Sequence, residues 1–379
     1  MADRDSEPVA RIAPGFAAID AGDWDRLAGA GDPFLNHRFL SLLEGSGSIG
    51  EGSGWTPIPL IVEAEGRAVA AAPAFLKGHS QGEYVFDHGW ADAWQRAGGA
   101  YYPKLQVAVP FTPVPGRRLL GSCPEAVLGG LRAVTAQFEL SSAHVTFCTP
   151  DEAALAGANG WLVRHGLQFH WFNRDYASFD EFLAALSSRK RKVIRKERAG
   201  AVAGLEVLTL RGAEILPGHW DAMWHFYQDT GQRKWGQPYL TRAFFQQVGA
   251  VMAEDCLLFL ALRDGRPIAG ALNFVGADTL YGRYWGASEE VDFLHFELSY
   301  YRAMEWAIAN GLKAVQAGAQ GEHKLARGYE PVRTYSVHHF PDAGFRRAVA
   351  DFLVREREAI AAEMAWTRAA LPYRSDGSA

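Results

Sequence analysis

Two apolar hairpin patterns lie about 200 residues apart, and this repeat constrains the fold more than any other feature of the chain. In the first pattern, apolar runs between positions 55 and 76 flank Glu65-Gly66-Arg67. In the second, apolar runs between positions 257 and 275 flank Asp264-Gly265-Arg266. An acidic residue followed by glycine between two such runs is typical of a tight β-hairpin turn. A spacing of one domain length predicts a duplicated α/β unit.

The segments around the hairpins fill out each copy. Long helices are predicted over 125–139 and 293–309, and another helix over 152–165 followed by a strand over 168–173. An aromatic, glycine-containing segment follows each hairpin, at 84–90 and at 280–286. The sequence therefore predicts an α/β (α+β) fold of two domains, 1–175 and 176–379. Each is expected to be a mixed, mostly antiparallel sheet flanked by helices, and the second opens with a basic helix.

Composition places the chain among ordinary globular proteins. Hydrophobic residues make up 48% and charged residues 21% of 379 positions, and the net charge of −5 does not favour a protein that coats DNA. The three cysteines form no CxxC pair, and no apolar stretch approaches the length of a membrane span. We therefore expect a cytoplasmic protein that at most visits the inner membrane as a peripheral protein.

Several catalytic classes lack their signatures in this sequence. It contains no GxxxxGK[ST], GxSxG or HExxH string, and no GxGxxG follows a predicted strand. The twelve histidines are scattered, and the adjacent His338 and His339 would point to opposite faces of a strand. We therefore expect no metal site.

The most polar segment lies between the two copies. Positions 187–198 read SSRKRKVIRKER, with seven basic residues and one acid, so the segment Arg189–Arg198 carries a net charge of +6. Such a density of charge is typical of a surface that meets phosphates on a membrane, a nucleotide or a tRNA. A solvated helix face would look the same in sequence.

Polar residues cluster at the ends of predicted elements in the second copy. Arg283, Tyr284 and Trp285 close a strand, and His295 and Glu297 open the long helix. Glycines 318 and 321 precede a short helix that carries Glu322, His323, Lys324 and Arg327. Glycines beside a helix N-terminus leave N–H groups that can hold an anionic group or a developing oxyanion. In the first copy, Asp87, His88, Tyr102 and Lys104 form a second, weaker cluster.

Seven strings resemble a bacterial family of predicted N-acyltransferases that is labelled peptidoglycan biosynthesis or Fem-like. They are YYPKLQVAVPFTPVPGRRLL, SSRKRKVIRKER, KWGQPYLTRAFF, DGRPIAGALNF, TLYGRYWG, FLHFELSYYRAMEWAI and GAQGEHKLARGY, and the similarity extends from about residue 30 to about residue 370. That family is similar to Fem-type aminoacyltransferases, which consist of two tandem GNAT-type domains. The resemblance therefore implies tandem GNAT-like domains here, in agreement with the repeat.

The resemblance implies transfer of an acyl group from an activated donor to an amine. In GNAT-type enzymes a neutral amine attacks a thioester, a base removes the proton, and backbone N–H groups at a splayed strand stabilise the oxyanion. One departure matters: the glycine-rich coenzyme A loop before the long helix is replaced by ASEEVDFLHFE at 287–297. Coenzyme A, acyl carrier protein and aminoacyl-tRNA therefore all stay open as donors.

Members of this family are also associated with bacterial ceramide synthesis. We accordingly expect a fatty acyl group to pass from acyl-CoA, a co-substrate rather than a bound cofactor, to the amine of a long-chain (sphingoid) base. The aromatic residues 293, 296, 300 and 301 would suit an apolar acyl groove or a core. An aminoacyl-tRNA-dependent transferase acting on a peptidoglycan precursor is the alternative, and a non-catalytic protein that binds an envelope ligand is the second.

Roles for the clustered residues follow from this interpretation. Glu322 and His323 are the first candidates for the base, and His295 and Glu297 the next. The remaining residues are expected to bind substrate: Arg283, Tyr284, Trp285, Lys324 and Arg327, together with Asp87, His88, Tyr102 and Lys104 facing the same cleft. The expected partners are a small-molecule donor and an amine, with an anionic membrane surface or tRNA at Arg189–Arg198 and no DNA.

Overall fold

The chain forms two compact units in the structure, a computed structural model that describes residues 8–234, 238–318 and 321–374. Unit 1 comprises Met1–Gly166 and Arg333–Ala362, and unit 2 comprises Leu167–Val332 and Glu363–Ala379. Two of the three boundaries between the units cut through strands, and the third cuts through the last helix. The domains predicted from the sequence repeat, 1–175 and 176–379, divide the chain differently and stay a prediction.

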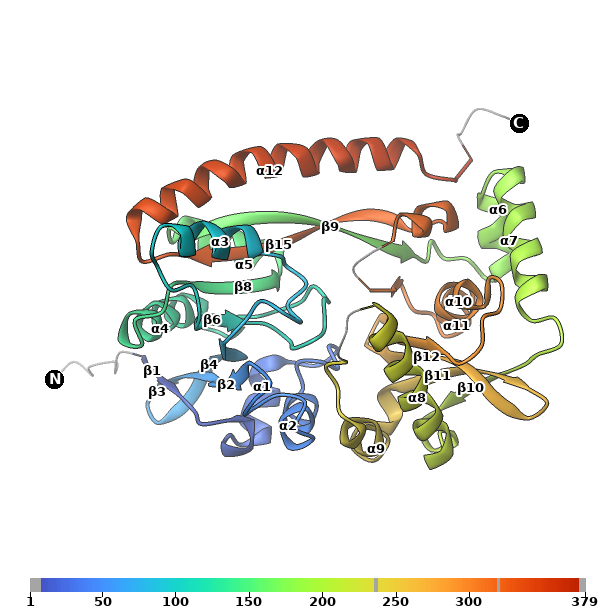
Figure 1. The fold of residues 1–379 in the computed structure, drawn as a ribbon, viewed down its shortest axis with the longest axis horizontal. Coiled ribbons are helices and arrows are strands. Elements are labelled where there is room, and N and C mark those ends of the chain that lie inside the picture. Colours follow the sequence, from blue (N-terminus) through green and yellow to red (C-terminus); the bar gives the residue numbers. More distant parts are fainter. Residues whose placement is uncertain (1–7, 235–237, 319–320, 375–379) are drawn as a thin grey trace. The chain divides into compact units, whose positions relative to one another are not determined.

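Unit 1 contains most of the first half of the chain (Figure 1). Its elements are β1 (Val9–Ile12), η1 (Phe16–Ala18), α1 (Ala21–Ala28), α2 (His37–Gly45), β2 (Trp55–Pro57), β3 (Leu60–Ala64), β4 (Arg67–Ala72), β5 (Ala74–Lys77), α3 (His88–Arg96), β6 (Lys104–Val107), β7 (Leu120–Gly121), α4 (Pro124–Gln137), β8 (Ala143–Cys148) and α5 (Pro150–Ala158).

Unit 2 holds the basic helix and the second hairpin. Its elements are α6 (Phe179–Ala185), α7 (Ser188–Ala201), β10 (Glu206–Arg211), η2 (Gly212–Glu214), α8 (Pro217–Lys234), α9 (Arg242–Val251), η3 (Ala253–Asp255), β11 (Cys256–Arg263), β12 (Arg266–Val275), β13 (Thr279–Ala287), α10 (Leu294–Phe296), η4 (Glu297–Tyr301), α11 (Arg302–Ala309), β14 (Ala314–Gln316) and η5 (Glu322–Arg327). Three elements have residues in both units: β9 (Leu162–Phe172), β15 (Glu330–His339) and α12 (Ala343–Ala369).

The two predicted hairpins are confirmed and share one turn geometry. Glu65 and Gly66 between β3 and β4 have φ of 52° and 73°, and Asp264 and Gly265 between β11 and β12 have φ of 49° and 74°. Two successive residues with positive φ define the tight turn whose twist matches a β-hairpin. The acidic-Gly pairs are thus the cause of both hairpins.

Corresponding strands follow in each unit, which confirms the mixed, mostly antiparallel fold. In unit 2, β13 pairs antiparallel with β12 and parallel with β14. In unit 1, β6 pairs antiparallel with β5 and parallel with β8. Pro73 separates β4 from β5, so the strand that corresponds to β12 is divided between two sheets. A helical segment links the parallel strands in each unit: α10, η4 and α11 in unit 2, and α4 in unit 1.

Two local predictions are wrong. The helix expected over 152–165 ends at Ala158, because Gly160 at φ 81° ends it and β9 begins at Leu162. The aromatic segments after the hairpins are not equivalent: 280–286 lies in β13, whereas 84–87 is a loop and 88–90 is the start of α3. The strand of unit 1 that corresponds to β13 is instead β6.

Each unit buries its own apolar core. Trp171, Tyr301 and Leu260 are buried in unit 2, and Val107 and Leu131 in unit 1. In unit 2, α8 packs directly on β13, where a Cβ on Gly286 would lie 2.0 Å from the carbonyl oxygen of Phe226. No helix within the described ranges is both long and apolar enough to cross a membrane.

Candidate functional site

A pocket of about 470 Å³ opens in unit 2 where two parallel strands part. β13 and β14 pair only from Thr279–Ala314 to Tyr281–Gln316, and β13 then continues to Ala287. Gly282, Ala317 and Gly318 line the gap. The register with β14 ends at Tyr281, so the edge of β13 beyond it borders the pocket and presents backbone N–H groups there. They are donors that an oxyanion could use.

A β-bulge shapes the strand wall of the pocket. Leu272 lies opposite Tyr284 and Asn273 opposite Gly282, so Arg283 is the extra residue. The buried side-chain amide of Asn273 donates to the carbonyl oxygens of Leu257 and Ala271, and its Oδ1 has no hydrogen-bond partner in the described structure. A Cβ on Gly282 would lie 3.3 Å from this oxygen, so a polar acceptor points at the narrow end of the gap.

The opposite wall is a helix that widens at the pocket. Glu297–Tyr301 forms a π-helical turn between α10 and α11, a distortion that is frequent at functional sites. Tyr300 from this turn and His323 from η5 both line the pocket, and the tyrosine hydroxyl lies 2.8 Å from His323 Nε2. Burial raises the pKa of Tyr300, although the charge of Arg327 lowers it in part. The phenol therefore stays protonated near neutral pH.

A buried lysine lies behind the pocket wall. Lys324 is fully buried and donates from Nζ to the carbonyl oxygen of Gly318 at 2.7 Å. Burial lowers its pKa to about 7, and the positive charge of Arg283 adds to this effect. A lysine that titrates near neutrality beside a pocket can supply a positive field for an oxygen that becomes negative.

The structure brings together five of the residues expected from the sequence. The residues that line the pocket are Arg283, Tyr284, Trp285, His295 and His323. Arg327 is instead paired with Glu197 at 2.9 Å and stacked on Phe296, with its guanidinium 3.4 Å from the ring centroid. Glu322 lies in η5, and its side chain is outside the described part of the structure.

Glu297 does not fit the role of a base. It is buried, with one carboxylate oxygen 3.0 Å from Arg198 Nε and the other 2.9 Å from Arg302 Nε. The Glu297 carboxylate is therefore paired with two guanidinium groups. Its ion pair with Arg198 joins α7 to the helical segment that contains Glu297. The expected aromatic groove is also only partly present. Tyr300 lines the pocket, but Tyr301 is buried in the core and Phe293 is 42% exposed.

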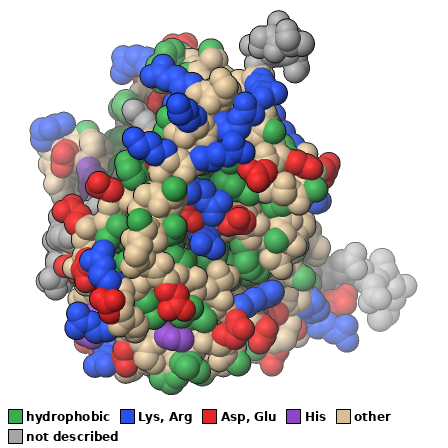
Figure 2. Space-filling model, turned by 90° about the vertical axis from the view of Figure 1, so that its right-hand side faces the viewer, with side chains coloured by type: hydrophobic (Ala, Val, Ile, Leu, Met, Phe, Trp, Pro, Cys, Tyr) green, Lys and Arg blue, Asp and Glu red, His purple; other side chains and the backbone are tan. Residues whose placement is uncertain are grey.

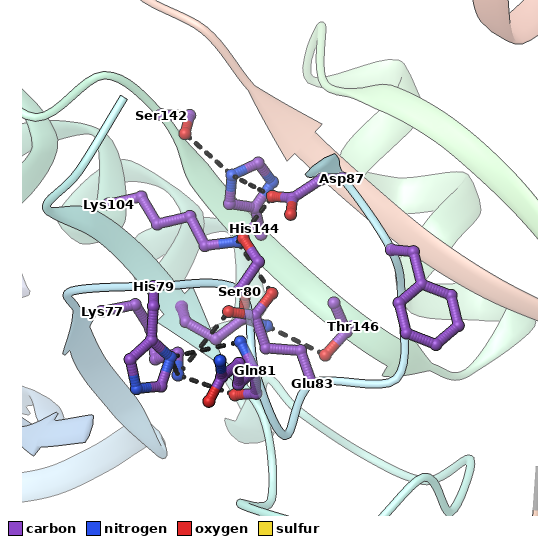
Figure 3. Close-up of polar contacts among 12 residues, drawn as sticks. Lys77, His79, Ser80, Gln81, Glu83, Asp87, Lys104, Ser142, His144 and Thr146 are labelled. Atoms are coloured by element: carbon purple, nitrogen blue, oxygen red, sulfur yellow. Dashed lines mark hydrogen bonds and ion pairs between the residues drawn. The ribbon is translucent and has the colours of Figure 1, made fainter. Parts of the chain in front are cut away.

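A second polar cluster is buried in unit 1 (Figure 3). Lys104 Nζ on β6 lies 2.5 Å from Asp87 Oδ2, 2.7 Å from Glu83 Oε2 and 2.9 Å from Ser80 Oγ. The hydroxyl groups of Ser80 and Tyr102 lie 2.7 Å apart in a hydrogen bond. Three of the four residues expected in the first copy therefore meet here. The fourth, His88, is exposed and stacks on Phe86. Whether these four face the pocket of unit 2 stays a prediction.

Two histidines extend this cluster across the sheet. His144 Nδ1 on β8 lies 2.7 Å from His338 Nδ1 on β15, and both rings are buried. Burial lowers the pKa of His144 to about 3, and Lys104 adds to this effect, so the ring is neutral. The sequence analysis missed Glu83 and the two histidines. The alternation of Ser142, His144 and Thr146 with apolar residues in a buried strand was a signal that could have found the polar face.

The charges of this cluster compensate each other. Burial lowers the pKa of Lys104, but Glu83 and Asp87 outweigh it and raise the pKa above its usual value. Burial raises the pKa of Asp87, but Lys104 and His144 outweigh it and lower the pKa. Burial raises the pKa of Glu83, which Lys104 offsets only in part.

Comparison with known proteins agrees with this architecture. The chain resembles the crystal structure of FemX (TM-score 0.56, 13% identity, 88% of this chain and 98% of that chain). It also resembles a conserved protein of unknown function from Bacteroides thetaiotaomicron (TM-score 0.52, 11% identity, 87% and 99%). A third similar structure is the C-terminal domain of a putative lysylphosphatidylglycerol synthetase from Agrobacterium fabrum (TM-score 0.50, 12% identity, 88% and 96%). No curated protein sequence matches the chain significantly.

The strand order repeats in the two units, and the pocket of unit 2 opens where its parallel strands part. The FemAB-like family model, described as peptidoglycan biosynthesis/recognition, matches residues 15–375. The chain therefore belongs to the FemAB-like family, as its sequence motifs indicated. Family and fold together point to a transferase of acyl or aminoacyl groups.

Proposed function

We propose that the protein is an N-acyltransferase that moves a fatty acyl group from a thioester donor to the amine of a lipid-like acceptor. The long-chain sphingoid base, which gives a ceramide-type amide, is the acceptor we put first. The observation that carries the proposal is the pocket between β13 and β14, which has aromatic walls and a buried lysine behind it. An apolar wall suits an acyl chain, and backbone N–H groups at the edge of a strand suit its carbonyl oxygen.

The reaction uses groups that face this pocket. The neutral amine attacks the thioester carbon, a C–N bond forms, and the carbonyl oxygen becomes negative beside the edge of β13 that borders the pocket. His323 accepts the proton that the amine loses. The C–S bond then breaks, and the leaving thiolate takes a proton from Tyr300, which His323 reprotonates across their 2.8 Å hydrogen bond. Lys324 stabilises the negative oxygen by its field through the pocket wall.

The test is thiol release from long-chain acyl-CoA with a panel of amines that includes sphinganine. We expect release that depends on the long-chain base and an amide product of the corresponding mass. His323→Ala should lower turnover about 100-fold or more, because general acid–base catalysis contributes about that much. His225→Ala, which removes an exposed histidine of α8, is the matched control and should retain full turnover. Normal turnover of His323→Ala would refute this assignment of the base.

Aminoacyl-tRNA-dependent transfer to a peptidoglycan precursor is the second candidate. The family description favours it, whereas the acidic turn before α10, which contains Glu289, Glu290 and Asp292, only weakens the case for coenzyme A. Carboxylates at the entrance to the helix disfavour the diphosphate of coenzyme A. If thiol release occurred with acyl carrier protein as donor and not with coenzyme A, the proposed thioester chemistry would stand and acyl-CoA would be excluded as the donor. Transfer only from aminoacyl-tRNA would replace the first proposal by the second.

Binding without transfer from any donor would refute both candidates. It would leave a non-catalytic protein that recognises an envelope ligand. The same amine panel tests this outcome, since ligand binding and product formation are separate measurements.

A further inference from the structure

The helix α7 divides its charged residues between two faces. On the inner side, Ile194 is buried, Glu197 pairs with Arg327 at 2.9 Å, and Arg198 pairs with Glu297 and Glu305 at 3.0 and 2.8 Å. These contacts attach the helix to the rest of unit 2. Arg195 pairs with Asp180 at 2.9 Å. The remaining basic residues are therefore not needed to hold the helix in place.

The outer side of α7 is a continuous exposed stripe. Arg189, Lys192, Val193 and Lys196 are all exposed, and their spacing of three and four residues places them on one face of the helix. Figure 2, which views the side of the molecule that carries α7 in Figure 1, shows Lys and Arg side chains gathered on the upper part of this face. The stripe thus presents three cations with an apolar side chain among them.

An exposed aromatic ring extends the stripe at its C-terminal end. Phe293 is 42% exposed, and a Cβ on Gly200, one turn beyond Lys196, would lie 3.9 Å from its Cδ2 atom. Val193 is 45% exposed. We name Arg189, Lys192, Val193, Lys196 and Phe293 the α7 stripe. Exposure of apolar groups to water is unfavourable, and their transfer into a bilayer interface is favourable.

We propose that the α7 stripe is a docking surface for an anionic lipid bilayer. Its cations meet lipid phosphates at the headgroup level, while Val193 and Phe293 enter the interface. A nucleic acid would be attracted by the cations in the same way, but it would make no use of Val193. The mixture of charged and apolar residues therefore selects a membrane over tRNA.

Docking at this stripe would bring the pocket of unit 2 close to the lipid. Phe293 directly precedes α10, and His295 and Ser299 of the following segment line the pocket. A lipid-like acceptor would then need only a short path out of the bilayer. This last link rests on the proposed function, whereas the docking surface itself does not.

Vesicle sedimentation of the full chain tests the proposal without any turnover assay. We expect binding to vesicles of phosphatidylcholine with about one third phosphatidylglycerol, and not to phosphatidylcholine alone. Replacing Arg189, Lys192 and Lys196 together by Gln should weaken binding about 100-fold, since each basic residue near an anionic surface contributes about fivefold. The same change at Arg67, Arg266 and Arg347, which are equally exposed elsewhere, is the matched control and should leave binding unchanged.

A second variant tests the apolar part of the stripe. Phe293→Asn removes the ring but keeps a residue that accepts the positive φ of 64° at this position. It should weaken vesicle binding about tenfold. Phe138→Asn, at a site that is 41% exposed, is its control.

Three outcomes would overturn the proposal. They are no binding of the wild type to anionic vesicles, an equal loss in the control triple variant, and wild-type binding by Phe293→Asn. Salt-sensitive tRNA binding that the α7 triple variant abolishes, with no vesicle binding, would assign the stripe to nucleic acid instead. Vesicle binding without acyl transfer would keep the docking surface and reject only the proposed function.

Discussion

Unit 1 and unit 2 each bury a lysine beside a pair of parallel strands, but the two lysines have opposite environments. Lys104 meets two carboxylates within hydrogen-bonding distance, and its pKa rises. Among the described residues, Lys324 donates to a carbonyl oxygen of its own loop and is repelled by Arg283, and its pKa falls to about 7. Burial disfavours the charge in both places, and the two carboxylates in direct contact with Lys104 outweigh that effect only there.

The space around the two lysines differs as well. In unit 2, Gly282, Ala317 and Gly318 leave space where the strands part, and a pocket remains. In unit 1, long side chains occupy the polar face of β6 and β8, among them Lys104 and His144. A duplicated frame thus carries an open polar site in one copy and a filled polar network in the other. The comparison predicts that Lys104 serves stability and Lys324 serves function.

Removal of the unit 1 lysine should have the largest effect. Lys104→Met leaves Asp87 buried without its lysine partner and leaves Glu83 with Lys77 at 3.8 Å, and an unpaired buried charge costs about 3–5 kcal/mol. We expect the free energy of unfolding in urea to fall by that amount. The triple variant Lys104→Met, Glu83→Gln, Asp87→Asn should recover part of the loss, because no buried carboxylate remains. Wild-type stability of the single variant would remove the basis of the comparison.

Removal of the unit 2 lysine should separate turnover from stability. Lys324→Met exchanges an uncompensated buried cation for an apolar side chain of similar length, so its unfolding free energy should stay within about 1 kcal/mol of the wild type or rise. Acyl transfer should fall about 100-fold, as expected for loss of an electrostatic group at a developing oxyanion. Equal losses of stability in Lys324→Met and Lys104→Met would contradict the assigned roles.

The pH dependence of stability should distinguish the two lysines further. The folded pKa of Lys324 lies below its unfolded value, so the unfolded chain binds more protons and this residue's contribution becomes more favourable as pH rises above about 7. The slope is at most about 1.4 kcal/mol per pH unit, the value for one proton. Lys104 has a raised pKa, so its contribution is fully present up to the unfolded pKa and is lost only as pH rises through the folded pKa.

Unfolding free energies between pH 7 and pH 10 measure this difference. The gap between the wild type and Lys324→Met should change with pH in favour of the wild type. A flat gap would mean that Lys324 is charged in the folded protein near neutral pH.

The sequence anticipated features that depend on neighbours in the chain. The hairpins follow from acidic-Gly turns, α7 from its run of helix-forming residues, and five pocket residues from their places at strand and helix ends. Contacts between distant positions escaped it. Glu297 looked like a base because Arg198, which neutralises it, lies 99 residues earlier. Glu83 was missed because it sits in a loop whose path is set by Lys104 on a later strand.

The smallest expected effect concerns the space between β13 and β14. A Cβ on Gly282 would lie 3.3 Å from Asn273 Oδ1 and 3.5 Å from Ala317 Cα and the carbonyl oxygen of Gln316, so Gly282→Ala should need a small shift of the Asn273 side chain and narrow the gap. We expect the KM for the acyl donor to rise several-fold with kcat nearly unchanged, because the change removes binding space and no reacting group.

Gly129→Ala on α4 of unit 1 is the control for this change. A Cβ there meets no atom within 4 Å, and the substitution should stabilise the helix by about 0.5–1 kcal/mol without altering KM. If Gly282→Ala left KM unchanged as well, the donor would not enter between the parting strands. The open copy of the repeat would then differ from the filled copy in packing alone, and the acyl-binding site would have to lie elsewhere.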